Sequence, residues 1–97
     1  MFEIEFTESA RDDFAFFDKH EQTIIVNGIE NQLFWQPQIA TRNRKPLRPN
    51  ALAQWELRVA KYRIFYDIAS EPRTVKIKAL GWKKHNRLFI RGREFAL

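Results

Sequence analysis

Two arginines, Arg58 and Arg63, flank a short gap in the segment WELRVAKYRIFY, residues 55–66. If Ala60–Lys61 forms the tip of a β-hairpin, Arg58 and Arg63 lie directly opposite each other, with Cβ atoms roughly 5 Å apart on the same face. Like charges in this arrangement destabilise a sheet unless something compensates for them. The spacing therefore predicts an anion site, because guanidinium groups match the geometry of phosphate oxygens.

Further side chains are expected on the face that carries the arginine pair. Glu56 lies two positions before the first arginine, where its carboxylate can neutralise one guanidinium. A later strand adds Lys76 and Lys78, with Phe65 and Leu80 among the charges. Cations interleaved with an aromatic ring suit RNA, since phosphates need charge and unstacked bases need a flat partner. The alternative is a solvated sheet face whose charges keep the protein soluble.

Charge is distributed unevenly along the chain. Up to Thr41 there are eight Asp/Glu and two Lys/Arg, whereas from Arg42 onward there are fifteen Lys/Arg and four Asp/Glu. Such polarity predicts that the second half meets a polyanion. A solvated basic surface explains the same composition equally well.

The remaining composition sets the class of protein. A chain of 97 residues with 44% hydrophobic and 30% charged residues predicts one globular domain, residues 1–97. It has no cysteine, which gives no support for a disulfide-stapled secreted module. The N-terminus lacks the pattern of a signal peptide, and no apolar stretch is long enough to span a bilayer. We expect a cytoplasmic protein with no membrane partner.

The first half of the chain predicts one strand and two helices. FEIEFT, residues 2–7, alternates in hydrophobicity with period two, as an amphipathic strand does. Ser9 with Asp12 three positions later predicts a capping box that starts the first helix. The second helix is expected from about Glu21 to Gln36. Its apolar stripe recurs every four residues, at Ile25, Ile29 and Leu33.

The second half predicts a loop and a meander of strands. Residues 37–53 contain three prolines and four bases and read as a loop. Strands follow at 53–59, 62–68 and 74–81, with a last short strand at 88–91, and their short connections favour antiparallel pairing. One sheet face is apolar, and we expect both helices to cover it; the face with the arginine pair is left open. The fold class is therefore α+β, with an N-terminal strand and two helices packed on one face of a small, mainly antiparallel sheet.

The order of these elements, together with WELRV, YRIFYDI and VKIKALGWKK, resembles the RelE/ParE family of bacterial toxins. The resemblance covers nearly the whole chain. It implies a RelE-like fold and an acidic antitoxin protein as partner. The implied activity is ribosome-dependent cleavage of mRNA or, in one branch of the family, poisoning of DNA gyrase. A toxin that has lost activity and only binds its antitoxin is the third reading.

The resemblance implies roles for individual residues. Arg63 matches the basic residue that the family nucleases use after a tyrosine in this strand, and Arg58 matches a frequent arginine in the preceding strand. His85 falls where those nucleases place an arginine or histidine beyond the glycine, and we expect it to act as acid or base, aided by Glu56. This cleavage needs no metal or cofactor. The residues expected to bind RNA are Arg42, Arg44, Lys45, Arg48, Lys76, Lys78, Lys83, Lys84, Arg87 and Phe89.

Three features of the chain depart from the family pattern. Some family nucleases carry catalytic lysines where this chain has Gln54 and Glu56. Near the C-terminus the nearest counterpart of a frequent tyrosine is Phe89, which has no hydroxyl. The hairpin tip has Ala60–Lys61 where glycine is usual. The missing tyrosine and lysines favour the gyrase reading somewhat, while the nuclease stays the leading expectation.

Overall fold

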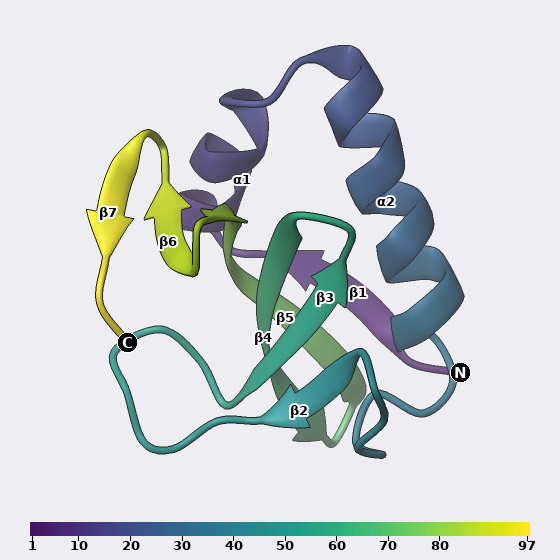
Figure 1. Cartoon of the computed structure of the whole chain (residues 1–97). Helices are drawn as coiled ribbons and strands as arrows, with labels where there is room; N and C mark the ends of the chain where they lie inside the picture. The colour runs from purple at the N-terminus through teal and green to yellow at the C-terminus, as the bar shows by residue number, and fades with distance from the viewer.

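The computed structural model describes all residues, 1–97, as one seven-stranded sheet with two helices on one side (Figure 1). The strands are β1 Glu3–Phe6, β2 Arg44–Pro46, β3 Trp55–Val59, β4 Tyr62–Ser70, β5 Arg73–Lys84, β6 Arg87–Ile90 and β7 Arg93–Phe95. The helices are α1 Glu8–Ala15 and α2 Lys19–Leu33. Strands β2 to β7 pair in chain order and antiparallel, and β1 pairs parallel with β5. The predicted fold class is confirmed.

Both helices begin earlier than the sequence predicts. The cap of α1 is Thr7, whose Oγ1 accepts a hydrogen bond from the backbone N of Ala10 at 3.1 Å, so Ser9 is not the cap. Helix α2 has Asp18 as its cap, and Asp18 and Glu21 form a reciprocal capping box. These local hydrogen bonds satisfy the free N–H groups of the first turn and set where each helix starts. Neither helix has the length and apolar character needed to cross a bilayer.

The main core lies between the helices and one face of the sheet. The predicted stripe of α2 is fully confirmed, since Ile25, Ile29 and Leu33 are all buried. They pack in one cluster with inward residues of β3, β4 and β5, among them Leu57, Ile64, Tyr62, Tyr66, Val75, Ile77 and Leu80. Burial of this apolar face holds the sheet and both helices together.

A β-bulge changes which residues of β5 face the helices. Phe65 pairs with Ala79 but Tyr66 pairs with Ile77, so Lys78 is an extra residue on β5. Because side chains alternate between faces, one extra residue reverses the alternation beyond it. Leu80 is therefore in the main core and Ala79 on the opposite face, which is the reverse of the prediction.

The face predicted to be open carries a second, smaller core. Phe65, Ala79 and Leu88 are buried there. The cover comes from the segment before β3 and from the C-terminal strands, through Leu47, Leu52, Ala53, Ile90 and Phe95. Phe65 is 0% exposed and is not available to stack on a base, so this part of the prediction is wrong. The sequence also missed β2 and β7, the short strands at the two ends of the sheet.

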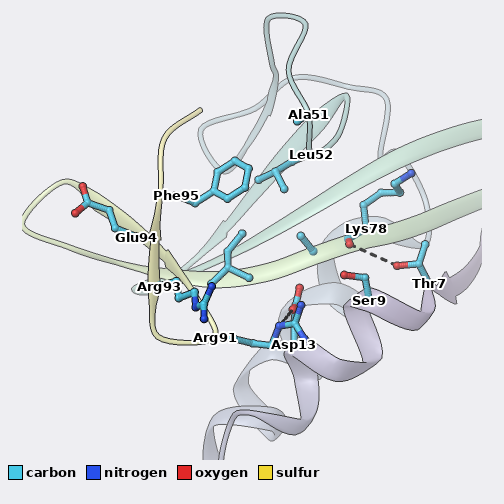
Figure 2. Close-up of a pocket in the computed structure, with 12 residues that line it drawn as sticks. Thr7, Ser9, Asp13, Ala51, Leu52, Lys78, Arg91, Arg93, Glu94 and Phe95 are labelled. Atoms are coloured by element: carbon cyan, nitrogen blue, oxygen red, sulfur yellow. Dashed lines mark hydrogen bonds and ion pairs between the residues drawn. The ribbon is translucent and has the colours of Figure 1, made fainter.

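The β6–β7 hairpin is anchored to α1 through one buried carboxylate. Asp13 Oδ2 accepts a hydrogen bond from the backbone N of Leu80 at 3.0 Å, and Oδ1 lies 2.8 Å from Arg91 Nε (Figure 2). Asp13 is 1% exposed, whereas the side chain of Arg91, in the β6–β7 turn, is about half exposed. This ion pair joins two segments far apart in the chain. It also closes one side of a cavity of about 820 Å³.

Gly81 allows β5 and β6 to approach closely. A Cβ at this position would overlap the carbonyl oxygen of Phe89, which is backbone and cannot turn away. We expect Gly81→Ala to lower the free energy of unfolding by about 1–2 kcal/mol through overpacking, measured by urea denaturation. Ser70→Ala, at an exposed end of β4, is the control and should change little. Equal stability of Gly81→Ala and the wild type would contradict this contact.

Candidate active site on the basic face

The arginine pair is where the spacing predicts it. Val59 pairs with Tyr62 and Arg58 with Arg63, across a two-residue turn in which Ala60 adopts φ 53°. Directly opposed residues share a face of the sheet. Arg63 Nη1 donates to the carbonyl oxygens of Ala60 at 2.9 Å and Tyr62 at 3.0 Å, which holds the guanidinium beside the turn. Its other nitrogens have no protein partner, and Arg58 is exposed.

The charges around Arg63 show how the pair is tolerated. Burial lowers the pKa of Arg63, and the nearby charge of Arg58 lowers it further. The charge of Glu56 acts in the opposite direction and raises the pKa. Glu56 thus compensates part of the repulsion while leaving guanidinium nitrogens free for a second anion.

Glu56 is a nearly buried carboxylate surrounded by cations. It is 6% exposed and lies opposite Lys45 of β2, whose Nζ is 4.0 Å from Glu56 Oε2. A cavity of about 430 Å³ opens beside it, lined also by Arg48 and Lys83. A carboxylate held in place and facing a cavity has the position that a general base requires.

Lys83 extends the basic surface on β5. Gly81 pairs with Arg63, so Lys83, two residues further, lies on the same face and beyond the arginine pair. The backbone N of Lys83 donates to the carbonyl oxygen of Lys61 at 2.8 Å, tying the β3–β4 turn to β5. We call Glu56, Arg58, Arg63, Lys83, Lys45 and Arg48 the basic site.

No protein-family model matches the chain, and no curated protein matches it either. A solved structure does match: the RelBE2 toxin–antitoxin complex from Mycobacterium tuberculosis, with a TM-score of 0.72 and 27% sequence identity. The alignment covers 84% of this chain and 98% of the chain in that complex. This match supports a RelE-family toxin.

Arg44 holds the fold together and does not belong to the basic site. Its Nη1 donates to the carbonyl oxygen of Gln32 at 2.7 Å, and its Nε donates to that of Ile39 at 3.0 Å. The side chain is buried and links β2 to the end of α2. Its guanidinium is therefore not free to bind RNA, and we leave Arg44 out of the basic site. Arg42, two positions earlier, is exposed in the loop before β2.

Lys76 and Lys78 lie toward the other end of the sheet. Lys76 pairs with Asp67 of β4 and with Glu5 of β1. Lys78 Nζ is 3.8 Å from Asp67 Oδ2. Arg63 precedes Asp67 by four residues, which corresponds to roughly 13 Å along a strand. Both lysines are thus separated from the basic site and placed among carboxylates.

The residues after Lys83 divide between the hairpin tip and the opposite face. Trp82 pairs with Phe89 and Lys84 with Arg87, so these four side chains lie on the face that carries the helices. His85 is exposed in the β5–β6 turn with φ 53°. It is four residues beyond Gly81, roughly 13 Å along the strand. The structure does not bring His85 next to Glu56.

Sequence reasoning missed the partner of Glu56. Lys45 was expected to bind RNA from a loop, but β2 places it in register with Glu56. The signal was weak because Pro46, which ends β2, is depleted in strands and tolerated only at sheet edges. It also missed the close contact at Gly81 and the aromatic contacts of Trp82.

Proposed function

We propose that this protein is the toxin of a type II toxin–antitoxin system and a metal-independent endoribonuclease that cleaves mRNA on the ribosome. The observation that supports this most is Glu56, nearly buried on the face of the opposed Arg58 and Arg63 and open to a cavity that Lys45, Arg48 and Lys83 also line. A carboxylate for proton removal and several cations for a developing phosphorane are the groups this cleavage requires. Such a toxin acts in the cytoplasm.

Each residue of the basic site has a role in this reaction. Glu56 removes the proton of the ribose 2′-hydroxyl, whose oxygen attacks the adjacent phosphorus. Arg63 and Arg58 bind the non-bridging phosphate oxygens and stabilise the extra negative charge. Lys83, which lines the same cavity, protonates the departing 5′-oxygen. Lys45, Arg48 and the exposed His85 hold neighbouring parts of the RNA.

An antitoxin partner follows from the same proposal. The matching solved structure is a toxin–antitoxin complex. The positive charge of the second half of this chain favours an acidic antitoxin segment, because complementary charge steers association. A segment bound over Arg58 and Arg63 would block the phosphate position.

Replacing Arg63 tests the proposal. We expect Arg63→Ala to abolish growth arrest on expression, and the cuts mapped on translated mRNA to disappear, because the main phosphate contact is lost. Arg11→Ala removes an exposed arginine from α1 and is the matched control, which should arrest growth like the wild type. Unchanged toxicity of Arg63→Ala would remove Arg63 from the site.

A gyrase inhibitor without its own chemistry is the second candidate. It is favoured by the absence of a hydroxyl at Phe89, whose ring stacks on Trp82, and by Gln54 in place of a lysine. This reading predicts DNA-damage signalling on expression, whereas the nuclease predicts immediate loss of protein synthesis. An inactive antitoxin-binding module would leave growth untouched.

A further inference from the structure

Three aromatic rings stack at one end of the helix-bearing face. The ring of Trp82 is stacked with that of Phe16 at a centroid distance of 5.6 Å and 16° between planes. It is also stacked with Phe89, at 5.9 Å and 19°. The rings come from the C-cap of α1 and from two paired strands, so segments distant in the chain build the stack. We call Phe16, Trp82 and Phe89 the aromatic ladder.

The ladder faces solvent at one end. Phe16 is 53% exposed, and Trp82 and Phe89 are only partly buried. The neighbouring Phe17 is the ring that enters the core, where it is 6% exposed. Phe16 therefore leaves much of its apolar surface in water, although its contacts fix its orientation. A group of stacked rings that stays partly exposed marks an interaction site more often than a single exposed ring does.

Cations lie directly beside the ladder. Lys84 pairs with Arg87, two residues closer to the hairpin tip than Trp82 and Phe89 and on the same face. This is a second pair of opposed cations, which again favours an anion between them. Glu94 is the acid in contact with Arg87, with its Oε1 3.7 Å from Arg87 Nη1. Both of these side chains are more than half exposed, so the ion pair is weak and a polyanion can displace it.

The β5–β6 hairpin connects the ladder to the basic site. Successive residues of β5 point to opposite faces, so Lys83 lies on the Glu56 side and Lys84 on the ladder side. His85 and Asn86 form the exposed turn between the strands. Positive charge therefore continues around the end of the sheet from one face to the other. A short stretch of single-stranded RNA leaving the basic site can follow this edge.

We propose that the aromatic ladder stacks an unpaired base of the same single-stranded RNA whose phosphate lies in the basic site. Stacking on an aromatic face is available to every base, so the ladder adds affinity and position without strict sequence choice. Arg87 and Lys84 bind the flanking phosphates. The inference rests on the proposed function for its ligand, but RNA binding at the ladder can be measured without cleavage.

The test uses the full chain carrying Glu56→Gln, so that bound RNA stays intact, and a single-stranded RNA oligonucleotide of mixed sequence. Trp35→Phe and Trp55→Phe make Trp82 the only tryptophan, and its fluorescence should be quenched when a base stacks. We expect Phe16→Ala to weaken binding about tenfold or more and to reduce the quenching. The matched control is Trp35→Ala in the chain that otherwise carries only Glu56→Gln. It removes an aromatic residue that is 68% exposed and outside the ladder, and it should leave affinity unchanged.

A charge variant tests the same site independently of ring packing. Arg87→Gln should weaken binding and reduce the salt dependence of the affinity by about one phosphate contact. Unchanged affinity of both Phe16→Ala and Arg87→Gln would overturn the ladder, even if the wild type cleaves mRNA. Normal RNA binding by Phe16→Ala with weaker association to a protein antitoxin would also overturn it, assigning the rings to that partner. If the wild type cleaves nothing but Phe16→Ala still loses RNA affinity, the ladder stands and the nuclease proposal fails.

Discussion

Glu56→Gln is expected to reduce the rate of mRNA cleavage by roughly 10²–10⁴-fold, the usual contribution of a general base. Glutamine keeps the size of the side chain that fills the space beside Lys45 and next to the cavity. It cannot accept a proton at neutral pH, so the 2′-hydroxyl loses its base. Single-turnover cleavage on programmed ribosomes, with RNA affinity measured separately, checks this result. If Glu56 is the base, Glu56→Gln lowers the cleavage rate, while its affinity for RNA equals or exceeds that of the wild type.

The control for Glu56→Gln is Glu5→Gln, which removes the same charge from an exposed position of β1. It should leave cleavage unchanged. If Glu56→Gln cleaves as fast as the wild type, Glu56 serves only to compensate Arg63. If Glu56→Gln mainly weakens RNA binding, the carboxylate positions cations and is not the base. Either result contradicts the assigned role.

Asp13→Ala is expected to lower the free energy of unfolding by about 2–3 kcal/mol. The substitution leaves the backbone N–H of Leu80 without its acceptor in the core. It also removes the anchor of Arg91, although that side chain is half exposed and can hydrate. Urea denaturation measures the loss, and faster amide exchange in β6 and β7 should show that the C-terminal hairpin opens first.

Asp12→Ala is the matched control. It removes a neighbouring carboxylate that is exposed, so the free energy of unfolding should change little.

The pH dependence of stability gives a second check on Asp13. Burial raises the pKa of Asp13 above its ordinary value of 3.8, so the native state binds this proton more readily than the unfolded chain. The contribution of Asp13 to stability therefore increases as the pH falls through the raised native pKa toward 3.8. Asp13→Ala should cost more in mild acid than at neutral pH, and the opposite trend would show that the ionised pair with Arg91 dominates.

Local sequence patterns predicted much of this fold. The four-residue recurrence of Ile25, Ile29 and Leu33 predicts the buried stripe of α2, because a helix places these residues on one face. The two-residue gap at Ala60–Lys61 predicts that Arg58 faces Arg63, because hairpin register follows from loop length. These features depend only on periodicity and turn length, which are written in neighbouring residues.

Tertiary structure decided which faces are open and which cations meet. One extra residue, Lys78, reverses the faces of β5, and the chain carries no local signal for that bulge. Burial of Phe65 depends on Leu52 and Phe95, which come from other parts of the chain.

The residues of the basic site were likewise predicted in part from the sequence and in part revealed only by the fold. The sequence by itself determined the basic second half and the arginine pair. Only the fold decided that Arg44 is bound by α2 and its following turn, that Lys45 meets Glu56, and that β5 continues beyond Gly81 through Lys84. The physical reason is that charge and periodicity are local properties. The burial and neighbours of a charged side chain depend on segments brought together by the folded chain.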